Sequence, residues 1–346
     1  MTDFKDVYII PQYSEITSRT QVNTSLIFKK SLINEEHDIK IDVPVMSANM
    51  DTVTDGTMAL AIGRAGGLGG VHRFMSIEDN IKEFNFVKNK QLAFMSVGVN
   101  SESRDRVKAL YEAGARFFII DIAHGHSLMM KEMIKFMRDN FGIYVYIMAG
   151  NVATPNACSD LISWGADAIK IGIGPGAVCS TKNVTGVTVP QFTAVQNVCA
   201  PENRAKYSKR YMEVAKEGKN NLFNKPILVA DGGIQEIGDI AKALGAGADL
   251  VMCGRLFAGC RETPGPRING KKVYRGMASK DAMLTIKDAS LLPTPEGIST
   301  VLETADEAVE EVIKNIKGGL QSAFSYSNAN NLEEFQRKCL FGYRNK

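Results

Sequence analysis

The amino-acid sequence predicts an α/β protein made of repeated strand and helix units. Its 346 residues are 45% apolar and 23% charged, a composition typical of one large globular domain. Short apolar runs alternate with amphipathic stretches, and polar or glycine residues follow directly after several of these runs. From this pattern alone, a closed (β/α)8 barrel and a doubly wound sheet are both consistent with the sequence.

Eight apolar runs have the length expected of buried parallel strands. In chain order they cover residues 43–47, 67–72, 93–99, 117–122, 144–149, 168–173, 227–230 and 250–253. Helical patterns fill most of the gaps between them, for example at 103–113, 128–139 and 154–164. After the first strand we expect a helix with Thr54 as its N-cap.

Charge and cysteine usage exclude several classes of protein. The net charge is only +3 and the basic residues are dispersed, so no nucleic-acid partner is expected. No segment is apolar enough to span a bilayer, and the start, MTDFKDVYII, has no signal-peptide pattern, so we expect a cytoplasmic protein without a membrane partner. The six cysteines lack CxxC spacing, which argues against a disulfide framework and a structural zinc site.

The segment 168–191, AIKIGIGPGAVCSTKNVTGVTVPQ, is the strongest functional signal. A β-branched run leads into Gly172, Gly174 and Gly176, and the loop then presents Cys179 at the C-terminal end of a strand, where parallel α/β enzymes hold their reacting groups. An isolated cysteine is usually a small buried apolar residue. Here the glycine-rich loop and the hydroxyl residues behind it favour a reactive thiol.

GIGPGAVCSTKNVTGVTVPQ resembles the active-site signature of the IMP dehydrogenase and GMP reductase family, as do PVMSANMDTVT, DIAHGHS, AGNVAT, VADGGI, VYRGMAS and KGGLQSA, all in the family's order. The resemblance implies a (β/α)8 TIM barrel in which Cys179 attacks C2 of a purine nucleotide, GMP or IMP. It also implies a homotetramer.

Several features resemble the reductases of this family more than the dehydrogenases. The pair of CBS modules that typical dehydrogenases carry after the second strand is missing, and Asp-Ile-Ala stands where dehydrogenases usually have a serine after the aspartate. No Arg-Tyr pair, which activates water in the dehydrogenases, occurs between Met277 and Glu296. We therefore expect an NADPH-dependent GMP reductase in which Thr181 and Glu296 relay a proton to the departing ammonia, with NADH as the alternative cofactor.

Two alternatives stay open at this stage. A dehydrogenase without CBS modules would fit the loop ending VTGVTVPQ. A nucleotide-binding barrel without turnover would fit Arg255, which replaces the serine or glycine usual in the family, and the long segment 200–225. That segment is basic and polar, and we expect it to add a surface helix with a solvated face or a subunit contact.

The barrel architecture and the resemblance together predict the binding residues. The nucleotide side comprises Ser47, Asp231, Gly232, Gly233, Gly254, Arg255, Tyr274, Gly276 and Met277, with Asp231 on the ribose and the glycines near phosphate. The cofactor side comprises Asp121, Ala123, Asn151 and Gly172. Asp121, at the end of a strand, also needs a hydrogen-bond donor.

Further expectations concern ions and mobile parts. Backbone carbonyls of Gly172, Gly174 and Cys179 are suitable ligands for potassium (K+). Gly318 and Gly319 resemble C-terminal glycines that help to bind this ion in the dehydrogenases of the family. For His124 and His126 we favour loop hydrogen bonds over a metal pair. Residues 277–300 are the expected mobile active-site flap of a single catalytic domain.

Overall fold

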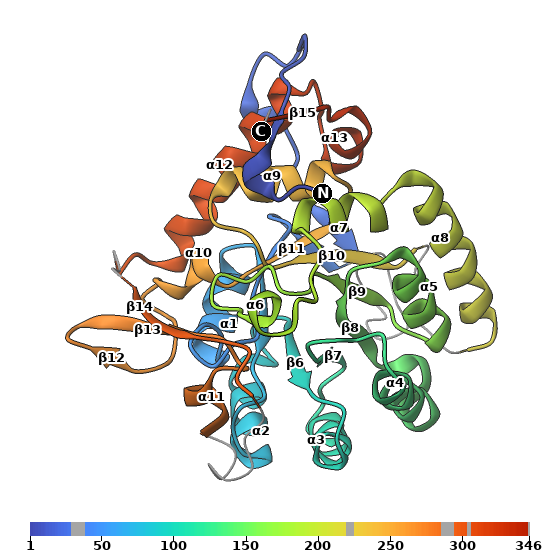
Figure 1. Cartoon of the computed structure of the whole chain (residues 1–346), viewed down its shortest axis with the longest axis vertical. Helices are drawn as coiled ribbons and strands as arrows, with labels where there is room; N and C mark the ends of the chain where they lie inside the picture. The colour runs from blue at the N-terminus through green and yellow to red at the C-terminus, as the bar shows by residue number, and fades with distance from the viewer. Residues whose placement is uncertain (29–38, 219–224, 285–293, 303–305, 345–346) are drawn as a thin grey trace.

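Eight parallel strands close into a barrel in the computed structural model, which describes residues 1–28, 39–218, 225–284, 294–302 and 306–344 (Figure 1). The order around the barrel is β10-β11-β4-β5-β6-β7-β8-β9. The strands are β4 (Val45–Ser47), β5 (Leu68–Val71), β6 (Ala93–Val97), β7 (Phe117–Asp121), β8 (Tyr146–Val152), β9 (Ala168–Ile171), β10 (Ile227–Asp231) and β11 (Leu250–Cys253). The fold is therefore a (β/α)8 barrel, and the doubly wound alternative is wrong.

The strands are continuous apolar runs because both of their faces are covered. Every residue of β6 is buried, as is every residue of β9, including its one lysine. Residues of this kind face either the barrel interior or the surrounding helices, so they show no alternation with polar residues. Most strand ends differ from the prediction by one or two residues, and β8 starts two residues later because Gly142–Tyr144 forms a 3₁₀ turn.

Helices surround the barrel and cover its outer face (Figure 1). Between successive strands lie α1 (Gly56–Arg64), α2 (Ile77–Val87), α3 (Ser101–Glu112), α4 (Leu128–Phe141), α5 (Pro155–Trp164), the group α6 (Thr181–Thr185), α7 (Gln191–Val198) and α8 (Pro201–Lys216), and then α9 (Ile237–Gly245). Within the described ranges, no helix is both long enough and apolar enough to cross a bilayer.

The prediction that Thr54 caps the first helix is wrong. α1 begins one residue later than expected, and Asp55 is its N-cap, since the Asp55 Oδ1 accepts the Met58 backbone N–H at 2.9 Å. The Thr54 hydroxyl is buried and donates to the Ala48 carbonyl at 2.7 Å and to the Ser47 hydroxyl at 2.9 Å. The Thr54 side chain thus links the end of the loop after β4 to the start of that loop, and it does not cap the helix.

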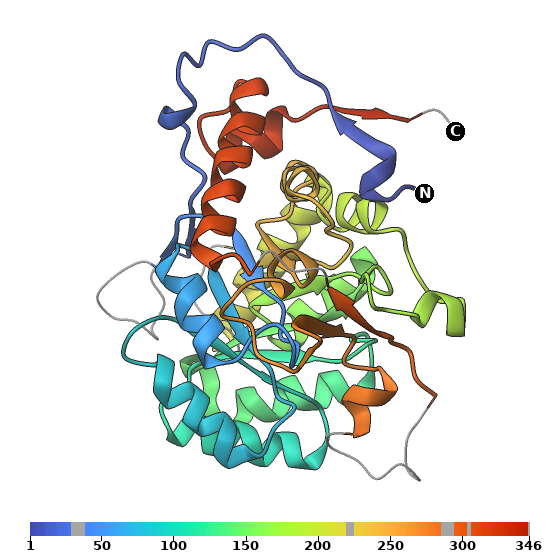
Figure 2. The same cartoon turned by 90° about the vertical axis from the view of Figure 1, so that its left-hand side faces the viewer.

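Segments outside the eight units extend the barrel at both ends of the chain. β1 (Val7–Ile9) pairs antiparallel with β15 (Phe341–Tyr343), so the two chain ends lie side by side next to α12 (Val309–Tyr326) and α13 (Leu332–Lys338) (Figure 2). The hairpin β2 (Leu26–Phe28) and β3 (Ile39–Ile41) also precedes the barrel, with the 3₁₀ turns η1 (Phe4–Asp6) and η2 (Arg19–Gln21).

After β11, a short α10 (Arg255–Ala258) leads into a small antiparallel sheet beside the barrel. Its strands are β12 (Arg267–Ile268), β13 (Lys271–Arg275) and β14 (Ser299–Leu302), with α11 (Lys280–Leu284) between the last two. The expected flap 277–300 falls on this region, and its residues 285–293 lie outside the described residues. Its mobility stays a prediction.

The segment 200–225 contains the helix that its sequence predicts, namely α8, while its residues 219–224 lie outside the described residues. This helix is more than a solvated surface element. Tyr211 is fully buried, and its hydroxyl donates to Oδ1 of the buried Asp167 at 2.9 Å. Arg204 forms an ion pair with the buried Asp249 at 3.1 Å. Asp167 immediately precedes β9, and Asp249 immediately precedes β11. The helix α8 therefore connects the N-terminal ends of these two strands.

Candidate active site

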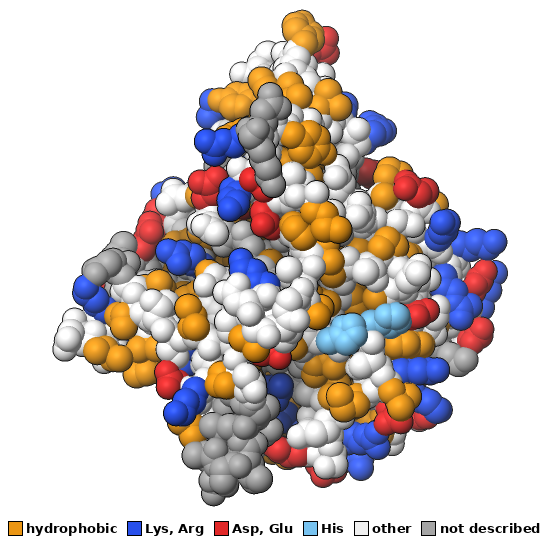
Figure 3. Space-filling model, in the orientation of Figure 1, with side chains coloured by type: hydrophobic (Ala, Val, Ile, Leu, Met, Phe, Trp, Pro, Cys, Tyr) orange, Lys and Arg blue, Asp and Glu red, His pale blue; other side chains and the backbone are white. Residues whose placement is uncertain are grey.

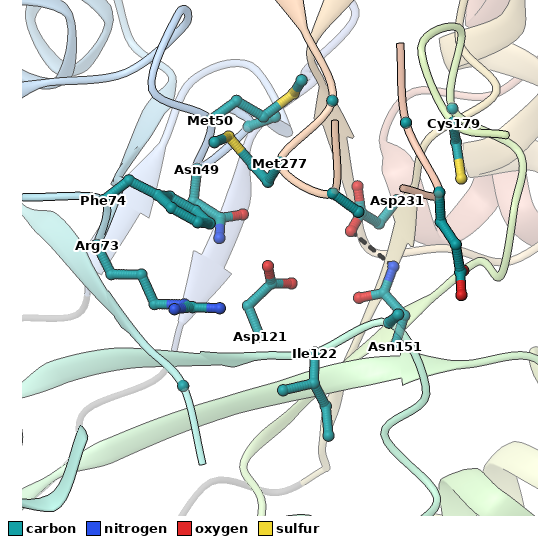
Figure 4. Close-up of a pocket in the computed structure, with 18 of the residues that line it drawn as sticks. Asn49, Met50, Arg73, Phe74, Asp121, Ile122, Asn151, Cys179, Asp231 and Met277 are labelled. Carbon is teal, nitrogen blue, oxygen red and sulfur yellow. Dashed lines mark hydrogen bonds between the residues drawn. The ribbon is translucent and has the colours of Figure 1, made fainter. Parts of the chain in front are cut away.

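A cavity of about 790 Å³ opens at the C-terminal ends of the barrel strands (Figure 4). Its wall takes residues from the ends of β7, β8, β9 and β10 and from the loops after β4, β5, β6 and β11. This is the end of a (β/α)8 barrel at which enzymes of this fold carry their catalytic groups.

Most residues predicted from the sequence meet at this cavity. Those that line it are Asp121, Ala123, Asn151, Gly172, Gly174, Cys179, Thr181, Asp231, Gly232, Gly254, Tyr274, Gly276, Met277 and Glu296. Three others lie just behind or beside the wall. Ser47 is fully buried with its hydroxyl accepting from Thr54, Gly233 packs on Gln191, and Arg255 is exposed at the start of α10.

Cys179 is the cysteine that faces this cavity. It is half-buried, and its thiol donates to the Thr181 hydroxyl with an Sγ to Oγ1 distance of 3.2 Å. Burial raises the pKa of the five other thiols, those of Cys158, Cys199, Cys253, Cys260 and Cys339. Those five thiols therefore remain protonated and unreactive at neutral pH, whereas Cys179 combines access with a hydroxyl neighbour.

Glu296 is held against the Cys179 loop by backbone contacts. The carbonyl of Glu296 accepts the N–H of Ser180 at 2.8 Å, and the next residue, Gly297, forms an isolated bridge with Cys179. The N–H of Glu296 donates to the Ala278 carbonyl at 3.0 Å. The segment after the expected flap and the cysteine loop therefore form one unit, which places a carboxylate at the cavity on the side of the thiol.

Tyr274 and Gly254 make a close corner near the end of β11. A Cβ at Gly254 would lie 2.7 Å from the Tyr274 hydroxyl, so only glycine leaves room for that side chain. Tyr274 is 3% exposed, and burial raises the pKa of its hydroxyl. The exposed Arg255 is the next residue after Gly254 and the first residue of α10. The neutral Tyr274 hydroxyl and the Arg255 cation therefore lie on either side of the Gly254 backbone, an arrangement suited to binding an anion.

A row of three charged side chains crosses the floor of the cavity. The Lys170 ammonium binds Asp121 and also lies 3.0 Å from Oδ2 of Asp231. The expected donor for Asp121 is thus confirmed. Burial would raise the pKa of Asp121, but the charge of Lys170 and its hydrogen bond outweigh burial and hold that pKa below its ordinary value.

The sequence interpretation did not include Lys170 or Arg73, and both line the cavity. A lysine inside the apolar run AIKIGIG is costly to bury unless it is paired, and this signal could have identified Lys170. Arg73, from the loop after β5, lies over the Phe74 ring with its guanidinium carbon 4.7 Å from the ring centroid. Its guanidinium extends toward Asp121 (Figure 4).

Asp51 and Arg275 form the ion pair that fixes the wall next to Met277. Two nitrogens of the Arg275 guanidinium bind the Asp51 carboxylate, and both side chains are largely buried. The Asp51 N–H also contacts the Met277 sulfur at 3.2 Å. The pair joins the loop after β4 to the end of β13, and so holds Tyr274 and Met277 on the cavity side.

The two histidines after β7 lie on the surface (Figure 3). His126 Nε2 is 2.8 Å from the Asp160 carboxylate, and its ring stacks on Trp164. His126 therefore makes the kind of loop hydrogen bond expected.

On the face shown in Figure 3, Lys and Arg side chains are interspersed with Asp and Glu, including along α8.

Of the residues expected at a potassium site, some lie together at the cysteine loop and others lie elsewhere. Gly172, Gly174 and Cys179 all line the cavity, and the Gly172 carbonyl already accepts the Asn151 side-chain N–H at 2.8 Å. Gln191, packed against Gly172, has a buried Oε1 without a hydrogen-bond partner among the described residues. Gly318 and Gly319 lie inside α12 and do not line the cavity.

Comparison with known proteins agrees with this geometry. A sequence model of the IMP dehydrogenase / GMP reductase domain matches residues 1–345. The inosine-5'-monophosphate dehydrogenase of Borreliella burgdorferi is 32% identical over 404 positions, covering 98% of this chain and 92% of the relative. The corresponding enzyme of Cryptosporidium parvum is 32% identical over 392 positions, with 98% and 90% covered.

A GMP reductase is equally similar. That of Buchnera aphidicola subsp. Acyrthosiphon pisum is 32% identical over 347 positions, covering 98% of this chain and 93% of the relative. The match over the whole chain, together with a barrel whose strand ends bring the motif residues to one cavity, shows that the chain belongs to the IMP dehydrogenase / GMP reductase family of oxidoreductases.

Proposed function

We propose that the protein is a GMP reductase, which converts GMP, NADPH and protons into IMP, ammonia and NADP+. One observation carries this proposal: the thiol of Cys179 contacts the Thr181 hydroxyl at 3.2 Å, and the Glu296 segment is paired with the same loop. A nucleophile, a hydroxyl and a carboxylate thus line one part of the cavity. Such a set suits attack on C2 of a purine followed by protonation of a leaving amine.

The chain's own residues account for the bond changes at C2. The Cys179 thiolate adds to C2 of GMP, and the C2–N bond breaks as Thr181 and Glu296 deliver the proton that lets ammonia depart. This leaves a thioimidate between Cys179 and the purine. The nicotinamide would supply the hydride that C2 accepts, after which the C2–S bond breaks, the thiolate returns and IMP is released.

The remaining residues divide into a nucleotide side and a cofactor side. Asp231 would accept a ribose hydroxyl, while the N–H groups of Gly232 and Gly254 and the hydroxyl of Tyr274 would bind the phosphate. Arg255 would add charge at the edge, with Ser47, Gly233, Gly276 and Met277 supporting this side. Asp121, Ala123, Asn151 and Gly172 would contact the nicotinamide end of NADPH.

Two features favour the reductase over the dehydrogenase. The Arg-Tyr pair that dehydrogenases use to activate water is missing from the stretch between Met277 and Glu296. Both alignments cover 98% of this chain, but their lengths differ. The alignment with the Buchnera reductase is 347 positions long, and the alignment with the Borreliella dehydrogenase is 404 positions long. The dehydrogenase therefore carries segments for which this chain has no counterpart.

A dehydrogenase without CBS modules is the second candidate. It is favoured by the loop ending VTGVTVPQ and by the relatives of similar identity that are named inosine-5'-monophosphate dehydrogenase. That enzyme would oxidise IMP with NAD and would then need water, rather than a proton on ammonia, to resolve the Cys179 adduct.

We also propose a potassium ion at the cysteine loop and a homotetrameric assembly. The Gln191 Oε1, which has no hydrogen-bond partner in the described part of the chain, and the loop carbonyls offer hard, uncharged ligands, which suit a monovalent cation. Because Gly318 and Gly319 lie in α12, they would not supply ligands to this loop within the same chain. The ion would hold the loop that carries Cys179.

A spectrophotometric assay of the purified protein tests the reaction. Absorbance of the reduced nicotinamide is followed with GMP and NADPH, GMP and NADH, IMP and NAD, and IMP and NADP+. We expect NADPH oxidation only when GMP is present, and no such activity in Cys179→Ala. Sustained NADH formation from IMP and NAD, with no oxidation of NADPH by GMP, would overturn the proposal in favour of the dehydrogenase.

A further inference from the structure

Lys170 occupies a position from which one cation reaches both sides of the cavity. Its side chain is 1% exposed, and it lies in β9. The register places Lys170 beside Gly150 of β8, and Gly150 beside Asp121 of β7. Three residues of neighbouring strands therefore form a single row across the barrel.

The glycine in the middle of this row makes the contact between its ends achievable. A Cβ at Gly150 would lie 2.5 Å from the Cβ of Lys170, closer than any side chain allows. Because Gly150 has no side chain, that of Lys170 has room beside β8, and its ammonium reaches the Asp121 carboxylate. On the other side, the same ammonium lies 3.0 Å from Asp231, at the end of β10.

Asp231 is held mainly through one of its oxygens. Oδ2 accepts from Lys170 at 3.0 Å and from the Asn151 side chain at 2.9 Å (Figure 4). The Asp231 carbonyl accepts from the Gln191 side chain at 3.1 Å. Both described hydrogen bonds of the carboxylate thus use Oδ2, which orients Oδ1 for a ligand hydroxyl.

We propose that Lys170 is a positioning residue that couples the nucleotide side of the cavity to the cofactor side, so that binding of one ligand strengthens binding of the other. This rests on the proposed function, since it takes Asp231 to contact the nucleotide and Asp121 the dinucleotide. A lysine side chain has several rotatable bonds, and its ordering has an entropic cost. A ligand that fixes Asp231 also fixes the ammonium, and thereby Asp121, so the second ligand meets an already ordered carboxylate.

The coupling is measured with GMP and NADP+, a pair that cannot complete turnover in either the reductase or the dehydrogenase direction. Every protein in this experiment, the one with the native Lys170 included, carries Cys179→Ala, so that GMP forms no covalent adduct. Calorimetry gives the dissociation constant of GMP with and without saturating NADP+, and that of NADP+ with and without GMP. Linkage requires the same factor from both measurements. We expect a factor of about 5 or more for the protein with the native Lys170, within the range of ordinary coupling energies.

Three variants separate coupling from a merely structural role. Lys170→Met should bring the factor close to 1, and Lys170→Arg, which can still donate to two carboxylates, should restore most of it. Lys135→Met removes an exposed lysine, 71% exposed on α4, and should leave the factor unchanged. Because Lys170→Met leaves two carboxylates without their cation, the charge-balanced double variant Lys170→Met with Asp121→Asn is used if the single variant does not fold. It is compared with Asp121→Asn alone, and its coupling factor should be the smaller of the two.

The outcomes distinguish this inference from the proposed function. A protein with the native Lys170 that binds GMP and NADP+ independently, or a Lys170→Met protein that keeps the full factor, overturns the role of Lys170 and leaves the reductase proposal intact. A protein with the native Lys170 that binds neither GMP nor a nicotinamide dinucleotide overturns both. Loss of the factor in Lys170→Met with recovery in Lys170→Arg supports the coupling.

Discussion

Glu296→Gln is the substitution that most sharply tests the proposed proton relay. The segment around Glu296 is held by backbone hydrogen bonds, from Ser180 N–H to the Glu296 carbonyl and from Glu296 N–H to the Ala278 carbonyl. Glutamine preserves all of these and keeps the size of the side chain. The free energy of unfolding should therefore change by less than about 0.5 kcal/mol.

Turnover should respond far more strongly than stability. A positioned general acid contributes at least about 10²-fold to rate, which corresponds to roughly 2.7 kcal/mol of barrier. Ammonia departs well only when protonated, so the loss should fall on deamination. Hydride transfer at C2 needs no proton from Glu296 and should proceed at a rate close to that of the wild type.

Two measurements separate these steps. Steady-state oxidation of NADPH with GMP should fall about 100-fold or more in Glu296→Gln. A single-turnover mixture of IMP and NADP+ runs the hydride step in reverse, leaving the purine on Cys179, and its burst of NADPH should persist. Glu310→Gln, on an exposed position of α12, is the control and should match the wild type. A folded Glu296→Gln protein with wild-type turnover of GMP would refute the relay.

Three further predictions concern stability and ions. Tyr211→Phe removes the hydrogen bond to the buried Asp167 carboxylate and should lower the free energy of unfolding by about 1.5–3 kcal/mol in urea titrations, whereas Tyr144→Phe at an exposed site should have no effect. Burial lowers the pKa of His72 to about 4 from 6.5, so the unfolded chain binds a proton that the folded chain excludes. Stability should therefore fall by roughly 3 kcal/mol as pH drops from 6.5 to 4, and His72→Gln should flatten that part of the curve. Rates in K+ should exceed those in a bulky organic cation several-fold, and equal rates would contradict an ion at the cysteine loop.

The sequence by itself was enough to predict the strands and the cysteine loop. Parallel strands covered on both faces must be apolar along their whole length, so the runs at 93–97 and 250–253 are visible without any knowledge of their partners. The loop at Cys179 is visible for a local reason too, because closely spaced glycines have little to offer in packing. The count of runs, with the family resemblance, was sufficient for the barrel.

Only the tertiary structure decided which polar residues meet across the barrel. Asp121 and Lys170 are 49 positions apart, and their contact depends on the register of β7, β8 and β9 and on the missing side chain of Gly150. Register is set by backbone hydrogen bonds and by closure of the whole barrel, neither of which leaves a local pattern in the sequence. The buried face of α8 is hidden for the same reason, since Tyr211 has a partner only once Asp167 is brought beneath it by the fold.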